Sequence, residues 1–284
     1  PDFDLKPFNR GPVPQDIWDA WNSDPNNPLL NRPISGQYPP GSVFKLVTAS
    51  LILKSGKEKV KYKCDGEYQI TKDVVKNFDE MSTSIISLYN LDKKKDLIID
   101  LGCNDGTLLQ QFKFKGFKLN LGVDPTDTIK YAKKKGISTI QSFFNIKTSK
   151  KIIKKYGKAK IVTTTNVFAH TNELYEFIKG TKNILRKDGI FVIENHYLLE
   201  VIKKNQFDTF YHEHLRTYSL KSLIKLMKHY NLHLVDAYTT SRYGGNIQAH
   251  FSHSERKFNT RIKKILSLEK KYLSDKKNYI KFKN

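Results

Sequence analysis

Apolar residues recur along the chain in two patterns, helical spacing and short continuous runs, which predict alternating helices and strands from Met81 onward. Helical spacing is clearest over residues 82–91 and 107–115. Short apolar runs predict buried strands over 96–101, 119–123, 137–141, 159–165, 189–194 and 247–252. This order is typical of an α/β fold with a doubly wound sheet that is mostly parallel and has an antiparallel last strand. Ligands bind such sheets at the carboxyl ends of the strands.

Two regions flank this pattern and differ from it in composition. Residues 1–57 are rich in Pro, Asn and Gly and contain both tryptophans. After residue 253 a Lys-rich helix is predicted over 255–276. We therefore expect an N-terminal fragment over 1–70, a catalytic domain over 78–253 and a helical linker to a further domain over 254–284.

Charge and cysteine content narrow the classes of function. The 50 Lys and Arg against 28 Asp and Glu give a net charge of +22, which raises the question of nucleic-acid binding. Because the lysines are scattered and no recognition motif accompanies them, we expect instead a solvated basic surface that helps attract an anionic substrate. Only Cys64 and Cys103 are present, which fits a reducing cytoplasm and supplies no zinc ligand set. No apolar run is long enough to cross a membrane.

A glycine-containing turn follows the first predicted strand, in the sequence Asp100-Leu-Gly-Cys-Asn-Asp-Gly106. Gly102 and Gly106 let the backbone approach a ligand and turn into a helix without a Cβ clash. Asp124 ends the second strand, where an acid accepts hydrogen bonds from both ribose hydroxyls. We assign no chemistry to Cys103, because a small side chain is simply tolerated at that place.

These two motifs resemble those of class I S-adenosylmethionine-dependent methyltransferases and lack the third glycine of dinucleotide-binding turns. The resemblance implies a Rossmann-like fold with S-adenosylmethionine as cofactor. The residues expected to bind the cofactor are Asp100, Gly102, Asn104, Gly106, Asp124, Pro125, Asn166 and Val167.

Three histidine-containing segments follow predicted strands and are expected to converge on one cleft: residues 166–170, 194–197 and 206–214. The spacing of His212 and His214 differs from the four-residue helical spacing of zinc-binding H-E-x-x-H, so we expect no catalytic metal. A general base is the better interpretation, because neutral imidazole suits proton abstraction and Glu213 can orient it.

Residues 206–218, QFDTFYHEHLRTY, together with 166–170, NVFAH, resemble the sugar C-methyltransferases that act on thymidine-diphosphate-linked deoxysugars, and the resemblance covers 78–253. It implies a nucleotide-sugar substrate and His214 as general base. Tyr211, Glu213 and His170 are implied as supporting groups. The chemistry agrees, because carbon beside a ketone becomes nucleophilic only after deprotonation to an enolate. His212 and His196 receive no role.

Residues 31–45 resemble the active-site segment of elongation-type penicillin-binding transpeptidases, with Ser42 three residues before Lys45. The Ser-Asp-Asn and Lys-Thr-Gly motifs of that family do not follow, so we expect this fragment to be inert. The four-cysteine module and C-terminal domain of the sugar methyltransferases are also not found, and Phe78 stands where that family has a tyrosine ahead of the first helix. We therefore expect cofactor binding with weak or absent sugar turnover.

Two alternatives remain open for the function. A class I methyltransferase directed at oxygen or nitrogen of a small molecule would not need His214 as an enolising base. A basic nucleic-acid-binding protein would lose affinity steeply with salt.

Overall fold

The computed structural model describes residues 72–206, 209–210 and 213–283. The chain divides into two units, residues 1–69 and 70–284, and the described residues all belong to the second. The transpeptidase-like segment with Ser42 and Lys45 therefore lies outside the described residues, as do Tyr211 and His212.

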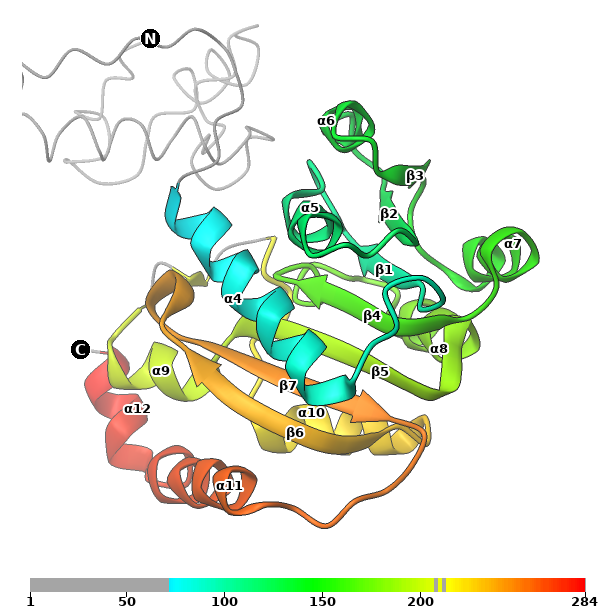
Figure 1. The fold of residues 1–284 in the computed structure, drawn as a ribbon. Helices are drawn as coiled ribbons and strands as arrows, with labels where there is room; N and C mark the ends of the chain where they lie inside the picture. Colours follow the sequence, from blue (N-terminus) through cyan, green and yellow to red (C-terminus); the bar gives the residue numbers. More distant parts are fainter. Residues whose placement is uncertain (1–71, 207–208, 211–212, 284) are drawn as a thin grey trace, which may run out of the picture. The chain divides into compact units, whose positions relative to one another are not determined.

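A seven-stranded sheet forms the centre of the second unit, with strand order β3-β2-β1-β4-β5-β7-β6 (Figure 1). Neighbouring strands from β3 to β5 run parallel, whereas β7 is antiparallel to both β5 and β6. The strands are β1 (Ile98–Leu101), β2 (Asn120–Asp124), β3 (Ser138–Gln141), β4 (Ala159–Thr165), β5 (Leu185–His196), β6 (His233–Thr240) and β7 (Asn246–Ser252). The predicted α/β fold with an antiparallel last strand is confirmed, but β6 was missed.

Helices cover both faces of the sheet, as a doubly wound fold requires. One apolar core packs α4 (Lys72–Tyr89), α5 (Thr107–Phe114) and α6 (Ile129–Lys134) against one face. The other core packs α7 (Ile146–Tyr156), α8 (Leu174–Ile184), α9 (Leu198–Lys203), α10 (Leu220–His229) and α11 (Thr260–Leu273). No helix in this described part of the chain combines the length and apolarity needed to cross a bilayer.

The prediction that the first helix begins at Ser82 is wrong, because α4 already includes Lys72. The first half of α4 is polar on most of its surface, so its helical spacing is weak in the sequence. Phe78 consequently lies within the helix. The guanidinium of Arg242 lies 4.4 Å from the centre of its ring, a cation–π contact.

The Lys-rich C-terminal stretch forms two helices, α11 and α12 (Lys276–Lys283), where a single helix over 255–276 was predicted. Ile262 and Ile265 of α11 are buried in the core. The buried carboxylate of Glu269 accepts hydrogen bonds from the backbone N–H groups of Leu220 and Lys221, at the start of α10. These contacts make α11 an integral layer of the second unit.

Helix α4 covers β7 through a layer of polar side chains. The Tyr89 hydroxyl lies 2.5 Å from His250 Nδ1, and His250 Nε2 lies 3.1 Å from Gln248 Oε1. Because Gln248 Oε1 only accepts, Nε2 carries the proton and Nδ1 accepts from Tyr89. Burial lowers the pKa of His250 to about 4, so the imidazole is neutral in the folded protein.

Acid is expected to destabilise this unit through His250. The ordinary pKa of 6.5 applies to the unfolded chain, whereas the folded-state pKa is about 4. Between these values the unfolded state binds more protons, so the free energy of unfolding falls as pH drops from about 6.5 towards 4, by up to about 3 kcal/mol. Urea denaturation across this pH range measures the slope. His250→Gln should lose that part of it, and equal slopes in both proteins would contradict the assignment.

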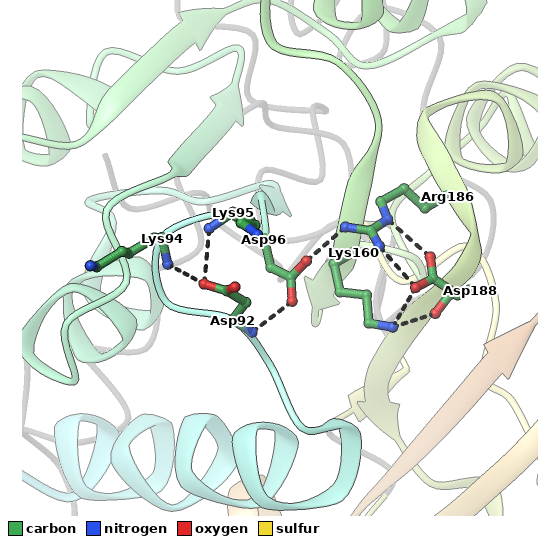
Figure 2. A network of polar contacts seen from close by, with 7 residues as sticks. All are labelled: Asp92, Lys94, Lys95, Asp96, Lys160, Arg186 and Asp188. Carbon is green, nitrogen blue, oxygen red and sulfur yellow. Dashed lines mark hydrogen bonds and ion pairs between the residues drawn. The ribbon is translucent and has the colours of Figure 1, made fainter.

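At the amino ends of β1, β4 and β5, a network of charged groups joins the three strands. Figure 2 shows Arg186 between Asp96 and Asp188, with Lys160 beside Arg186 and paired with the same Asp188. Arg186 Nη1 lies 2.7 Å from Asp96 Oδ1, and Lys160 Nζ lies 2.9 Å from Asp188 Oδ2. The Asp96 side chain is only 8% exposed, so its ion pair with Arg186 is the most shielded contact of this network.

Replacing Arg186 with alanine is expected to lower the free energy of unfolding by about 1–2 kcal/mol, because Asp96 is left buried without its ion pair. The expected loss is moderate because the Arg186 side chain is itself 37% exposed to solvent, which screens the ion pair. Urea denaturation measures the change. Lys94→Ala, at an exposed residue of the same loop, is the matched control and should shift stability by less than about 0.5 kcal/mol. Equal effects of the two changes would contradict the prediction.

Candidate active site

The turn between β1 and α5 depends on two glycines with positive φ, Gly102 and Gly106, both at +78°. A Cβ on Gly102 would lie 2.2 Å from Val167 Cγ2, in the segment that follows β4. A Cβ on Gly106 would lie 2.7 Å from Ile137 Cδ1 and 2.8 Å from the Cβ of Ala132. The lack of a side chain at Gly102 therefore leaves room for the segment after β4. At Gly106 it leaves room for Ile137 and Ala132, which pack under the turn.

Asp124 ties this turn to the end of β2. Its Oδ2 accepts from the backbone N–H of Asn104 at 2.9 Å, and its Oδ1 accepts from the N–H of Thr126 at 2.9 Å. Asn104 adopts φ +51°, a conformation that asparagine tolerates better than most residues. Pro125 follows, half-buried. The structure thus brings together the predicted residues Asn104, Asp124 and Pro125 at one edge of the sheet.

Asp100 is buried beneath the turn and accepts a hydrogen bond from Thr163 Oγ1 of β4 at 2.6 Å. Burial raises its pKa to about 7, and the nearby carboxylates of Asp124 and Asp105 add to the shift. Because this folded-state pKa is higher than the ordinary value of 3.8, the folded protein binds more protons than the unfolded chain between these two pH values. The contribution of Asp100 to the free energy of unfolding therefore rises as pH falls from about 7, whereas that of His250 falls. Its burial and its hydrogen bond with Thr163 give Asp100 a structural role beneath the turn.

Cys103 has a packing role in the turn. Its side chain is buried, and a Cβ on Gly122 would lie only 2.5 Å from its Sγ. Burial raises the pKa of the thiol, which disfavours the reactive thiolate.

The segment after β4 connects the turn to the histidines. Asn166 has φ +53° and accepts at Oδ1 from Asn246 Nδ2 at 3.3 Å. Val167 lies over Gly102. The backbone N–H of His170 donates to the Val167 carbonyl at 2.9 Å, which closes a turn and leaves His170 exposed. The predicted residues Asn166 and Val167 thus form a wall beside Gly102, and the turn that follows it carries His170.

Three imidazoles and a tyrosine ring form a row beyond this wall, called the imidazole row below: His170, His214, His196 and Tyr243. The ring centres of His170 and His214 are 4.7 Å apart, those of His196 and His214 are 5.0 Å apart, and those of His196 and Tyr243 are 5.9 Å apart. The predicted convergence of the three histidine-containing segments is therefore present for the described residues.

The hydrogen bond of His214 defines its basic nitrogen. His214 Nδ1 lies 2.7 Å from the carbonyl oxygen of Thr209, which only accepts, so Nδ1 carries the proton and Nε2 carries the lone pair. Both His214 and the neighbouring Glu213 are half-buried. Although His170 keeps much of its surface exposed, partial desolvation and then repulsion from His214 lower its pKa. The row is thus set up with neutral His170 beside His214.

The sequence interpretation expected residues 194–197 at the cleft but gave His196 no role, and it missed Tyr243 and a buried polar cluster below them. The buried carboxylate of Glu194 accepts from Asn246 Nδ2 at 3.1 Å and Gln248 Nε2 at 2.8 Å, and pairs with Arg242 Nη1 at 2.9 Å. Polar residues at alternate positions of 194–196 and 246–250 were a signal for such a cluster. Only the pairing of β5 with β7 shows that they meet.

Within the described ranges, no group of three His, Cys, Asp or Glu side chains is arranged to hold a metal ion.

Comparison with known proteins assigns a family to this region. A methyltransferase domain model matches residues 72–237, more than half of the chain. The C-methyltransferase NovU of Streptomyces niveus is 36% identical over 153 residues, which are 54% of this chain and 36% of NovU. A solved structure from Galdieria sulphuraria, assigned to the sarcosine dimethylglycine methyltransferases, matches with a TM-score of 0.50 at 11% identity, covering 73% of this chain and 98% of that one.

A second family matches the N-terminal part. A penicillin binding protein transpeptidase domain model matches residues 3–88. The peptidoglycan D,D-transpeptidase PbpA of Mycolicibacterium smegmatis is 51% identical over 41 residues, 14% of this chain and 8% of PbpA. The chain thus covers well under two thirds of either NovU or PbpA.

The chain belongs to the methyltransferase domain family. Its described domain has the class I methyltransferase fold, as the sequence predicted. S-adenosylmethionine is the methyl donor that the sequence predicts for this domain.

The residues at the carboxyl edge fit this donor. Asp124 Oδ1 accepts from both the N–H and the hydroxyl of Thr126, whereas Oδ2 accepts from the Asn104 N–H and has a second lone pair that can accept from a ribose hydroxyl. The carboxyl groups of Asp100 and Asp124 lie close enough that one raises the pKa of the other, and such an electronegative edge complements a sulfonium cation.

Proposed function

We propose that this methyltransferase transfers its methyl group to carbon beside the ketone of a nucleotide-linked keto-deoxysugar, of the thymidine-diphosphate type. The observation that carries the proposal is the position of His214, whose Nδ1 is anchored to Thr209 and whose ring lies between those of His170 and His196. The 36% identity to a C-methyltransferase supports it. A methyltransferase directed at oxygen or nitrogen would not need a base that removes a proton from carbon.

The chain's residues have distinct tasks in this reaction. His214 Nε2 removes the proton from the carbon beside the ketone, and the electron pair of the broken C–H bond moves into the enolate. His170, kept neutral by its lowered pKa, donates a hydrogen bond to the developing oxygen. Bound S-adenosylmethionine supplies an electrophilic methyl group, and the enolate carbon takes that methyl as its bond to sulfur breaks. The proton on His214 then leaves to solvent.

The cofactor is proposed to lie along the edge formed by the glycine turn and the wall after β4. Asp124 accepts from the ribose hydroxyls, with Asn104 and Pro125 beside it. Asn166 and Val167 face the methionine portion across Gly102. The roles of Tyr211 and Glu213 as supporting groups stay predictions.

Two measurements test the proposal. Calorimetry with S-adenosylmethionine tests the donor site, and we expect saturable binding. Proton exchange then tests the acceptor: in D₂O, with S-adenosylhomocysteine in place of the donor, the chain should exchange the protons beside the ketone of a thymidine-diphosphate keto-deoxysugar. Donor binding together with methyl transfer to a hydroxyl or amine, and no exchange at carbon, would refute the proposal and favour the alternative acceptors.

A further inference from the structure

Tyr243 stands out in its backbone conformation, with φ 47° and ψ 38° inside the short helix η3 (Arg242–Gly244). Among the described residues, the other non-glycine positions with positive φ are all asparagines: Asn90, Asn104, Asn166, Asn205 and Asn231. Asparagine visits this region at little cost, whereas an aromatic residue is strained there. The Tyr243 side chain is 53% exposed, so burial of its ring does not offset the strain. Strain of this kind is concentrated at functional sites.

The backbone of Tyr243 is held from the amino side by Arg242. The Arg242 side chain is 4% exposed and lies 2.9 Å from the carboxylate of Glu194, itself 1% exposed. The ring of Phe78 covers the guanidinium at 4.4 Å. A buried ion pair of this kind is costly to break, so the position of Arg242 is firmly set.

The carboxyl side of Tyr243 is held by two glycines. Lys204 Nζ donates to the Gly244 carbonyl at 2.6 Å, and a Cβ on Gly244 would lie 1.8 Å from Gln206 Nε2. A Cβ on Gly245 would lie 2.8 Å from the Cβ of Glu200. The turn therefore packs against Glu200 and Gln206, at the start of the segment that carries His214.

This fixed turn presents the Tyr243 ring to the imidazole row. The ring meets His196 edge to face, with ring planes at 74° and centres 5.9 Å apart, and His196 in turn neighbours His214. Tyr243 therefore stands at the end of the row opposite His170.

We propose that Tyr243 is a specificity-determining residue that contacts the sugar of the acceptor beside the carbon that His214 deprotonates. The proposal rests on the proposed function above. The exposed ring covers the C–H face of the sugar, and the phenol hydroxyl hydrogen-bonds to a sugar hydroxyl. The contacts of Arg242, Gly244 and Gly245 hold this ring in place before the acceptor arrives, at the cost of the backbone strain.

The test compares three variants in the full chain: Tyr243→Gly, Tyr243→Asn and Tyr243→Phe. Glycine and asparagine tolerate this backbone, so both variants should keep or raise the Tm, while the dissociation constant for a thymidine-diphosphate keto-deoxysugar rises about tenfold or more. Affinity for S-adenosylmethionine should stay unchanged. Tyr243→Phe should raise the same dissociation constant by a smaller factor, and this factor measures the contribution of the hydroxyl group alone.

Asn231→Gly is the matched control, since it frees another position at φ 54° just after α10, outside the imidazole row. It should leave both affinities unchanged. If Tyr243→Gly binds the keto-sugar like the wild type, or loses Tm and both affinities together, the assigned contact is wrong. If the wild-type chain itself neither binds the keto-sugar nor exchanges its protons, the proposed function fails, and the sugar contact of Tyr243 falls with it.

Discussion

Replacing His214 with alanine is expected to slow proton exchange beside the ketone of the acceptor by about 100-fold or more, because general-base catalysis contributes that much. The structure gives the reason at atomic level, since Thr209 O fixes the proton on Nδ1 and leaves Nε2 as the basic nitrogen. The affinity for S-adenosylmethionine should change by less than about twofold, because the glycine turn does not depend on this ring.

A second variant distinguishes loss of the base from loss of local structure. His214→Asn retains an N–H that donates to the Thr209 carbonyl but has no basic nitrogen, so it should be as slow as His214→Ala. His229→Ala, at an exposed histidine of α10, should exchange at the wild-type rate. Exchange followed by NMR in D₂O measures all three. Wild-type exchange in His214→Asn would rule out His214 as the base, and unchanged methyl transfer in both His214 variants would indicate an oxygen or nitrogen acceptor.

The parts of the fold that the sequence predicts well are those encoded by neighbouring residues. Strand β4 is found over Ala159–Thr165, as predicted, because it is an uninterrupted run of residues buried or half-buried on both faces. The turn at Gly102 and Gly106 was predictable because φ +78° is a conformation that glycine adopts freely. Asn104 and Asp124 meet at 2.9 Å because β1 and β2 are adjacent parallel strands whose carboxyl ends share an edge.

Other features depend on residues far apart in the chain and were missed for that reason. Strand β6 contains Asp236, which in the sequence indicates an exposed position. In the structure, Arg261 of α11 pairs with this carboxylate, at 2.7 Å from Oδ1, and allows it to be buried. Tyr243 joins the candidate site because β6 ends and β7 begins at the carboxyl edge of β5, where Asn246 pairs with His196.

Val167 connects the turn at Gly102, which depends on neighbouring residues, with the rest of the site, which depends on distant ones. It packs directly against Gly102, where there is no side chain. One methyl group of Val167 occupies the place where a Cβ on residue 102 would lie. The same segment continues to His170. The contact between Val167 and Gly102 therefore helps to set the distance between the cofactor turn and the imidazole row. A change at Gly102 should therefore affect both cofactor binding and the position of the row.

Replacing Gly102 with alanine is expected to weaken S-adenosylmethionine binding by about 100-fold and to lower the free energy of unfolding by on the order of 3 kcal/mol. Its new Cβ would lie 2.2 Å from Val167 Cγ2, at a φ of +78° that L side chains rarely adopt. Gly157→Ala is the matched control, because Gly157 has φ +82° and nothing within 4 Å of its would-be Cβ. That variant should lose stability through the backbone alone and bind the cofactor normally.

The double variant Gly102→Ala with Val167→Ala separates the clash from the backbone strain. Removing both γ-methyl groups of Val167 eliminates the two shortest contacts, at 2.2 and 2.9 Å, so part of the stability and of the cofactor affinity should return. Calorimetry and urea denaturation of the single and double variants give the coupling between the two positions. If the effects of the two substitutions simply add, or if Gly102→Ala behaves like Gly157→Ala, Val167 does not set the space above the turn.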